Sequence, residues 1–290
     1  MLERDGLVFN IARCLTPKPY RATARRISYG FQDFVRKGIP NLLYYGTPDI
    51  FERACFESNT DCNFNRCWYC PQSIDPKENH LMGDEVYQTM VQQLSRIGRQ
   101  GFRGMFAPVF FGEPTMLGRK LVDMMDFTRT RLPNAELHIF TNGILLTPAL
   151  YDELIRAGVD KIIITRHPGA STRNPDRLRE HAEPKEYKKH VWDRTSDDIK
   201  KLWERNPVII PSYRVLRLER CPMAAEQLTV DWQGNVLFCC NDYYGRYQHG
   251  NIMGRDILAI WKEPEFSKLR AEVRKGIYRL DLCRKCMGCS

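Results

Sequence analysis

The sequence lacks the long apolar segments that would place a protein in or across a membrane. No stretch of roughly eighteen apolar residues occurs in the 290-residue chain, which argues against a transmembrane helix. The N-terminus shows no apolar segment behind a basic one, so no secretory signal is expected and the protein is predicted to be cytoplasmic. Low-complexity segments, internal repeats and a clear nucleic-acid-binding module are also missing. A membrane is therefore not expected as a partner, and a nucleic acid partner has no binding module in its favour.

The composition is that of an ordinary globular protein with an excess of basic residues. Apolar residues make up 43% of the chain and charged residues 27%. The net charge of +9 favours anionic partners in general, although such a surplus is more often a solvated surface. A phosphorylated or nucleotide-linked small molecule fits this charge as well as a nucleic acid does. An anionic small-molecule substrate is therefore one candidate partner.

Cysteine is plentiful, with eleven residues. In a reducing cytosol, clustered thiols more often bind metal or act chemically than form disulfides. Cys14 and Cys55 stand apart and are expected to be ordinary thiols. The others form two groups, the first being Cys62, Cys67 and Cys70, and the second Cys221, Cys239, Cys240, Cys283, Cys286 and Cys289. Each group is a candidate metal centre.

The first group lies in CNFNRCWYC, residues 62–70, and offers three thiolates, one fewer than a closed zinc or iron–sulfur site normally takes. Three cysteines can bind three irons of a 4Fe-4S cluster and leave the fourth iron open to a small molecule. The alternatives are a loose trio of core cysteines and a Cys3His zinc site, for which His80 is a weak fourth ligand. The spacing favours the iron–sulfur cluster.

This segment resembles the signature of the radical S-adenosylmethionine (SAM) superfamily, Cys-x3-Cys-x2-Cys with an aromatic residue before the last cysteine. Tyr69 occupies the aromatic position. The chain departs from the pattern because four residues, not three, separate Cys62 from Cys67. The resemblance implies that SAM itself completes the coordination of the open iron.

A second motif supports the resemblance. FFGEPTM follows a predicted strand and is similar to the family's GGEP motif, which binds the amino group of SAM. Gly112, Glu113 and Pro114 match the motif, and Phe111 replaces its first glycine. The resemblance implies that these three residues help to bind SAM.

A third motif follows on the next strand. FTNG is similar to a recurrent strand-end segment of the family, which makes Thr141 and Asn142 candidate SAM-binding residues. Arg166 ends the following strand and is a candidate partner for the SAM carboxylate, with a surface ion pair as the alternative.

Periodicity predicts alternating helices and strands, typical of βαβ units and a parallel sheet. Helices are predicted over 82–97, 117–131 and 147–159, and strands over 105–111, 136–143, 160–165 and 208–216. The charged segment 169–206 interrupts this rhythm and is predicted to be an insertion or an exposed helical excursion. The resemblance implies an α/β fold, a partial (β/α)6 barrel, with the site at the carboxyl ends of the strands.

The C-terminal part differs in character. A hairpin is predicted around Gln233-Gly234 and a single helix over 256–276. The cysteine spacing resembles the auxiliary-cluster domains of the SPASM and twitch types, and the short chain favours the twitch form with one cluster. The resemblance implies four ligands, Cys221, Cys239, Cys283 and Cys286. Cys289 competes for the last place, and a zinc ribbon is the alternative to the cluster.

Cys240 is adjacent to a predicted ligand. It could donate a hydrogen atom to a substrate radical, as a radical epimerase requires. Alternatively, neighbouring residues of a hairpin point to opposite faces, and Cys240 simply packs. The predicted domains are an N-terminal extension (1–50), the barrel (51–215) and a small α+β twitch-like domain (216–290) made of a β-hairpin plus a helix.

The resemblance implies a radical SAM oxidoreductase or epimerase. Its reduced cluster would cleave SAM to a 5′-deoxyadenosyl radical, which abstracts a hydrogen atom from a small polar substrate such as a sugar or aminocyclitol. An external one-electron reductant, flavodoxin or ferredoxin, and a second 4Fe-4S cluster complete the expected cofactors and partners. The alternatives are a radical SAM maturase of a ribosomally made peptide and a non-catalytic iron–sulfur electron carrier or redox sensor. The last has no use for Glu113.

Overall fold

The computed structural model describes residues 32, 34–67, 69–194 and 220–287. The chain divides into two compact units, Met1–Ile50 and Phe51–Ser290. The described part of the first unit is a π-helical turn, η2 (Phe34–Gly38), followed by helix α3 (Ile39–Tyr45). In the described part of the chain, no helix is both long and apolar enough to cross a membrane.

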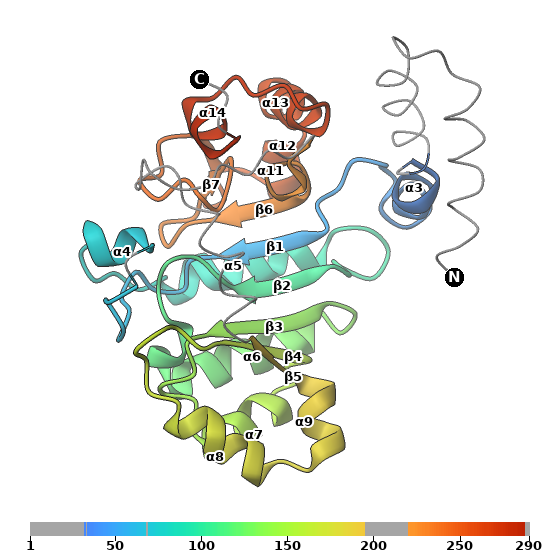
Figure 1. The fold of residues 1–290 in the computed structure, drawn as a ribbon. Coiled ribbons are helices and arrows are strands. Elements are labelled where there is room, and N and C mark those ends of the chain that lie inside the picture. Colours follow the sequence, from blue (N-terminus) through green and yellow to red (C-terminus); the bar gives the residue numbers. More distant parts are fainter. Residues whose placement is uncertain (1–31, 33, 68, 195–219, 288–290) are drawn as a thin grey trace, which may run out of the picture. The chain divides into compact units, whose positions relative to one another are not determined.

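The second unit is built on an eight-stranded sheet with the order β5-β4-β3-β2-β1-β6-β7-β8 (Figure 1). The strands are β1 (Arg53–Phe56), β2 (Met105–Pro108), β3 (Glu136–Thr141), β4 (Lys161–Thr165), β5 (Val191–Arg194), β6 (Gln227–Val230), β7 (Asn235–Leu237) and β8 (Gln248–Asn251). All neighbours from β5 through β6 are parallel, whereas β7 and β8 continue the sheet antiparallel. The predicted α/β class is confirmed.

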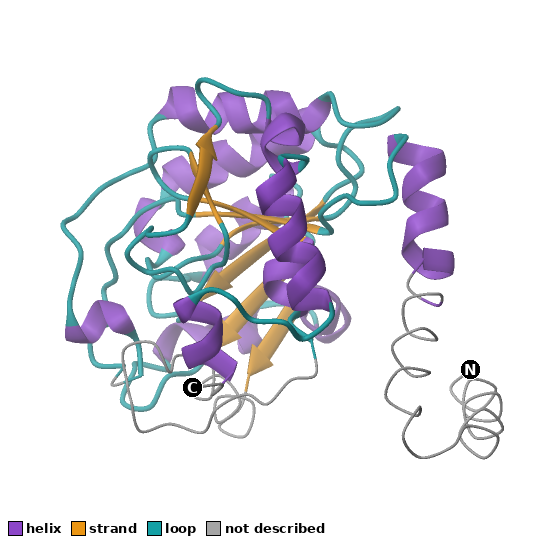
Figure 2. Ribbon diagram, turned by 90° about the horizontal axis from the view of Figure 1, so that it is seen from above, coloured by secondary structure: helices purple, strands orange, loops and turns teal. Residues whose placement is uncertain are grey.

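Helices surround the strands, as the view from above shows (Figure 2). The helices between the parallel strands are α4 (Pro71–Ile74), α5 (Asp84–Ser95), the 3-10 helix η3 (Pro114–Leu117), α6 (Arg119–Arg131), α7 (Pro148–Arg156), α8 (Arg173–His181) and α9 (Pro184–His190). The C-terminal helices are α11 (Pro222–Glu226), α12 (Ile257–Trp261), α13 (Pro264–Arg274) and α14 (Asp281–Met287).

Apolar periodicity explains how the helices pack on the sheet. Helix α5 buries Tyr87, Met90 and Leu94, which recur at three- and four-residue spacings. The Tyr87 ring lies 5.4 Å from the ring of Phe56 on β1, which in turn lies 4.9 Å from Phe106 on β2. Burial of each such ring stabilises the fold by about 2 kcal/mol. Phe56 and Phe106 therefore face the helical layer.

The elements predicted from 82 to 165 are largely confirmed. They correspond to α5, β2, α6, β3, α7 and β4. The predicted strand over 105–111 is shorter than expected, since β2 ends at Pro108. Residues 109–113 instead form the loop that carries the GEP motif.

The segment 169–206, predicted as a charged insertion or an exposed helical excursion, is helical in part, but its described part belongs to the sheet unit. This part forms α8, α9 and β5, and β5 pairs in parallel with β4 from Ile162↔Val191 to Thr165↔Arg194. The charges lie on exposed helical positions while Leu178 is fully buried, so composition concealed a regular βα unit. Residues 195–206 and the strand predicted over 208–216 lie outside the described residues.

The C-terminal part joins the same sheet. The predicted hairpin is confirmed as β6 and β7, paired at Val230↔Val236. Strand β6 also pairs in parallel with β1. The single helix predicted over 256–276 is wrong, because Pro264 begins a second helix, which Glu263 caps by accepting a 2.9 Å hydrogen bond from the Phe266 amide.

Candidate functional site

The first cysteine group lies in the loop that leaves the carboxyl end of β1 and enters α4. Burial raises the pKa of Cys62 to about 11 and that of Cys67 to about 12, and the Cys70 thiol adds to both shifts. The three thiols are therefore near enough to interact electrostatically. A buried thiolate is unfavourable without a cation, and iron would supply the positive charge. This donor set fits a cluster bound by three cysteines.

A single-ion zinc site fits less well. Within the described ranges, no group of three or more His, Cys, Asp or Glu side chains is close enough to hold one metal ion. The cysteines of a cubane bind separate irons and so need not converge on one point. His80 is also engaged elsewhere, because its ring stacks on Trp232 at 4.1 Å.

Glu113 connects the ends of β2 and β3. Its side chain is buried, and its Oε1 accepts hydrogen bonds from the Thr115 amide (3.1 Å), the Thr115 hydroxyl (2.5 Å) and the Thr141 hydroxyl (2.7 Å). Oε2 accepts from the Asn142 amide at 2.8 Å. Burial raises the pKa of this carboxyl, and these donors lower it. The GEP and TNG motifs, separate in sequence, thus form one hydrogen-bonded unit, and Pro114 begins η3 beside it.

Gly112 lets this unit contact the cysteine loop. A Cβ at this position would lie 2.0 Å from the carbonyl oxygen of Asn59, so only glycine fits. The Glu113 amide donates to the Asp61 carbonyl at 2.8 Å, and Asn59 Nδ2 donates to the Glu113 carbonyl at 3.1 Å. The loops after β1 and β2 are therefore held together one residue before Cys62.

Asn142 extends these contacts to the thiols. Its Nδ2 donates to Asn63 Oδ1 at 2.8 Å and lies 3.9 Å from Cys62 Sγ. Its Oδ1 accepts from the Ile144 amide at 2.9 Å, which fixes the orientation of the side chain. The structure thus brings together the residues predicted from all three motifs.

Tyr69 reveals a residue that the sequence did not single out. Its hydroxyl is hydrogen-bonded to His167 Nδ1, and its ring lies 5.8 Å from the His167 ring. Phe64 stacks on the same imidazole with centroids 6.2 Å apart. Burial lowers the pKa of His167 to about 4, so the ring is neutral near pH 7. Its position two residues after the end of a predicted strand was the sequence feature that could have identified it.

Arg166 is placed differently from the SAM-binding residues predicted with it. Its Nε and Nη2 bind the two oxygens of Asp193 at 2.8 and 2.7 Å, and Nη1 binds Asp176 at 2.7 Å. These hydrogen bonds raise the pKa of the guanidinium. The geometry favours the ion-pair alternative, in which Arg166 joins β4 to β5 and α8.

The second cysteine group gathers from separate elements. Cys221 precedes α11, Cys239 follows β7, and Cys283 and Cys286 lie three residues apart on α14, hence on one face. Burial raises the pKa of Cys283 to about 12 and of Cys286 to about 11, and the Cys221 thiol adds to both. The Cys221 thiol also raises the pKa of Cys239. The thiols of the four predicted ligands are therefore close enough to interact electrostatically, as the ligands of a second cluster would be, while Cys289 lies outside the described residues.

Cys240 belongs to the same group. Its thiol is hydrogen-bonded to Cys239, the largest cause of the raised pKa of Cys239, and it also interacts with Cys221 and Cys286. The Cys55 thiol on β1, which is 1% exposed, also interacts electrostatically with the Cys240 thiol, and this raises the pKa of Cys55. The interaction between the Cys239 and Cys240 thiols does not follow the expectation that adjacent hairpin cysteines point apart. The Phe238 amide still donates to the Tyr247 carbonyl at 3.0 Å, so both cysteines come after the last backbone pair of the hairpin.

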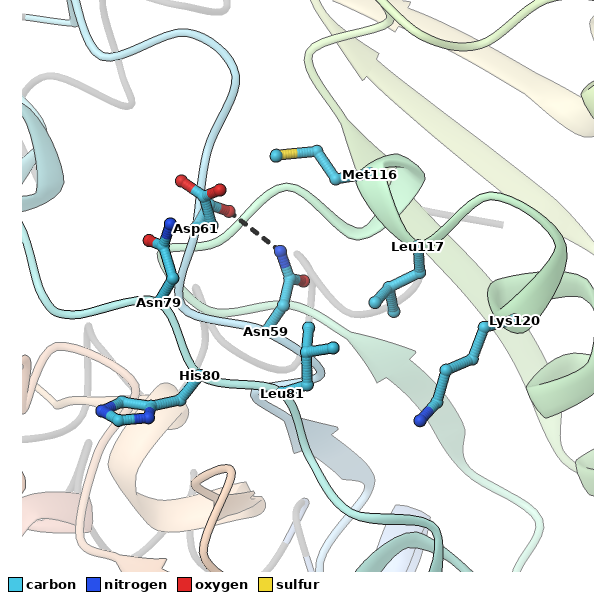
Figure 3. A pocket seen from close by; sticks show the side chains of 8 residues that line it. All are labelled: Asn59, Asp61, Asn79, His80, Leu81, Met116, Leu117 and Lys120. Atoms are coloured by element: carbon cyan, nitrogen blue, oxygen red, sulfur yellow. Dashed lines mark hydrogen bonds between the residues drawn. The ribbon is translucent and has the colours of Figure 1, made fainter.

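A cavity of about 430 Å³ borders the cysteine loop from the side of η3 and α6 (Figure 3). It is lined by Asn59, Asp61, Asn79, His80, Leu81, Met116, Leu117 and Lys120. The Asn59 amide donates to the Asp61 carbonyl at 2.9 Å, and Lys120 pairs with Asp84 at 2.7 Å. The cavity is thus bordered by Asn59 and Asp61, whose backbone groups contact Gly112 and Glu113.

Comparison with known proteins agrees with this geometry. The family model of the radical SAM superfamily matches residues 57–202. The model of SPASM, an iron-sulfur cluster-binding domain, matches residues 221–287. The two matches include both cysteine groups.

Individual relatives show the same pattern. The S-adenosyl-L-methionine-dependent 2-deoxy-scyllo-inosamine dehydrogenase of Niallia circulans is 30% identical over 245 residues, 83% of this chain and 94% of that protein. The crystal structure of BtrN in complex with AdoMet and 2-DOIA has a TM-score of 0.67 and 28% identity, covering 81% of this chain and 92% of that one. A polyhistidine-tagged form of anSMEcpe with bound AdoMet is similar in fold, with a TM-score of 0.56 and 16% identity over 82% of this chain and 91% of its own.

Proposed function

Because this chain belongs to the radical SAM superfamily and carries a SPASM iron-sulfur cluster-binding domain, we propose that it oxidises a hydroxyl-bearing carbon of an aminocyclitol or a similar small cyclic substrate. The observation that carries the proposal is the 30% identity to a 2-deoxy-scyllo-inosamine dehydrogenase across 94% of that protein. We also propose that residues 51–215 form the barrel domain and 216–290 the auxiliary domain.

The cysteines fit the cofactors of the family. Cys62, Cys67 and Cys70 would hold the 4Fe-4S cluster that binds SAM, and the second group would hold the auxiliary 4Fe-4S cluster through Cys221, Cys239, Cys283 and Cys286. When bound, the first cluster and SAM would supply a 5′-deoxyadenosyl radical able to remove a hydrogen atom from the substrate, and the auxiliary cluster would accept the remaining electron as the hydroxyl proton leaves to solvent.

The protein's own residues position and enclose this chemistry. Glu113 and Asn142 hold the loops after β1, β2 and β3 in one arrangement through fixed hydrogen bonds, which keeps a bound SAM oriented. Phe64 and Tyr69 of the cysteine loop pack against His167 and so fix part of this loop against the end of β4. We propose that backbone and side-chain groups of Gly112, Glu113 and Pro114 contact the methionine part of SAM.

Cys240 bears on the choice between oxidation and epimerisation. Its thiol lies among the predicted ligands of the auxiliary cluster, where it could return a hydrogen atom to the substrate. The dehydrogenase relative instead favours oxidation, in which no hydrogen atom is returned. We therefore propose oxidation as the reaction and assign Cys240 no required role in it.

The other candidate functions have less support. A peptide maturase would resemble enzymes such as anSMEcpe, but the similarity to that structure is one of fold at 16% identity. An electron carrier has no need of the Glu113 unit beside an open iron. The required electron would come from flavodoxin or ferredoxin as an external reductant.

Metal analysis and product detection test the proposal together. After anaerobic reconstitution, the chain should bind about eight iron and eight sulfide ions, as two cubane clusters require. With SAM and a strong reductant it should form 5′-deoxyadenosine, and 2-deoxy-scyllo-inosamine should be converted to the corresponding ketone. A content of about four iron ions per chain, with zinc bound by the second cysteine group, would argue against the auxiliary cluster. A protein with both clusters intact that does not cleave SAM would refute the proposed radical SAM activity.

A further inference from the structure

Glu57 is a buried carboxylate with one oxygen left unpaired. Its side chain is 0% exposed, and Oε1 accepts a hydrogen bond from Lys77 Nζ at 2.8 Å. Oε2 is buried and has no hydrogen-bond partner within the described ranges of the chain. The backbone amide of Trp232 acts on this carboxylate as a hydrogen-bond donor and lowers its pKa, although Oε2 has no partner at full hydrogen-bond geometry. Buried polar atoms in native proteins are normally paired, so this exception needs a partner such as a water, an ion or a ligand.

The position of Glu57 points to the interior of the barrel. It follows β1 directly, and its amide donates to the Val230 carbonyl at 2.9 Å, so the extended backbone continues through it. Side chains alternate along extended backbone, and Phe56 packs toward α5. Glu57 therefore lies on the face of the sheet opposite to Phe56, together with Cys55. The Cys55 thiol interacts electrostatically with Cys240 of the auxiliary group.

Three functional loops meet at the Glu57–Lys77 pair. Lys77 Nζ lies 5.1 Å from the ring centroid of Phe110, two residues before the GEP motif, and 4.8 Å from that of Tyr243, in the loop after Cys240. The Tyr243 hydroxyl donates to Gln72 Oε1 at 2.7 Å, two residues after Cys70. The pair therefore contacts loops that follow both cysteine groups.

The local charge differs from that of the whole chain. Although the protein carries a net charge of +9, the described groups at this junction are the carboxylates of Glu57 and Asp231 and one ammonium, that of Lys77. Asp231 contributes negative charge to this junction. Its own oxygens are already engaged, because they accept hydrogen bonds from the amides of Gln233 and Asn235 and from Asn235 Nδ2. Burial raises the pKa of Glu57, and a cation placed against Oε2 would stabilise its charged form.

We propose that Glu57 Oε2 accepts a hydrogen bond from the ammonium group of a cyclic amino polyol substrate, while Lys77 holds the carboxylate in place. This inference rests on the proposed function and names the substrate group that the site selects. It also explains how a basic protein can accept a cationic small molecule, since the selection is made by a local carboxylate.

The test compares 2-deoxy-scyllo-inosamine with the same ring bearing a hydroxyl in place of the amine. Binding of each compound to the reconstituted, SAM-loaded full chain is measured by calorimetry, with KM and kcat measured in parallel. Wild type should prefer the amine, and Glu57→Gln should abolish this preference and raise KM by about tenfold or more, with kcat changed less, as loss of a buried charged partner implies. Glu57→Asp should retain part of the preference.

The control is Glu78→Gln, a neighbouring carboxylate whose side chain is 92% exposed, which should behave as wild type. Glu57→Gln with full iron content and an unchanged amine preference would overturn the inference. Failure of wild type to bind either compound would overturn it too, whether or not SAM is cleaved. By contrast, if the wild-type protein binds the amine but forms no 5′-deoxyadenosine from SAM in the absence of substrate, that result would count against the proposed function alone.

Discussion

At the scale of single residues, the site depends on how closely two loops approach at Gly112. The carbonyl of Asn59 occupies the space that a Cβ would need, and both loops continue into residues that carry the proposed chemistry. Asn142 performs a comparable task between the end of β3 and the cysteine loop, where it contacts Asn63 and Cys62. Small changes at these contacts should therefore affect SAM cleavage before they affect the fold.

Gly112→Ala should reduce SAM cleavage by at least about tenfold and destabilise the protein by about 1–3 kcal/mol, because the new Cβ would collide with backbone. The measurements are 5′-deoxyadenosine formation and thermal unfolding. Gly83→Ala is the matched control, since nothing lies within 4 Å of its Cβ position and its φ is −65°. Equal activity of the two variants would contradict the assigned contact.

At the scale of elements, β4, α8 and β5 are tied together by Arg166. The guanidinium is 24% exposed and Asp193 15%, so the bidentate pair is partly desolvated and should contribute more than a surface ion pair. Its partner Asp176 is 53% exposed and should contribute little. The charged segment that composition marks as an insertion is therefore anchored to the sheet.

Arg166→Lys should lower the stability of the chain by about 1–3 kcal/mol, because lysine cannot form the bidentate pair with Asp193. Thermal unfolding and the KM for SAM are the measurements. Arg119→Ala, which removes an exposed pair with Asp123, should cost at most about 0.5 kcal/mol. An unchanged melting temperature with a KM for SAM raised more than about tenfold would instead assign Arg166 to SAM binding.

At the scale of the whole second unit, one sheet carries both cysteine groups. Strand β6 pairs with β1, so the loops after these two strands leave the same edge, and the auxiliary group lies on the continuation of the sheet. This continuity places Cys55 of β1 near Cys240. The two proposed clusters are therefore positioned by shared backbone hydrogen bonds.

Removing one auxiliary ligand should separate the two functions of the molecule. Cys286→Ala should reduce the iron content from about eight to about four per chain and abolish ketone formation, while 5′-deoxyadenosine is still formed. Cys240→Ala is the control and should keep both clusters and ketone formation. Loss of SAM cleavage in Cys286→Ala together with full loss of iron would show that the two sites do not assemble independently.

The sequence by itself determined the family, the α/β class, most elements between 82 and 165 and the chemical nature of both cysteine groups. These follow from local patterns: apolar periodicity sets helices and strands, and thiol spacing with the GEP and TNG motifs sets the chemistry. Only the tertiary structure decided which residues meet. It placed Thr141 and Asn142 on Glu113, Asp193 on Arg166, and Lys77 on Glu57, because each of these contacts joins segments whose separation along the chain carries no information about their distance in space.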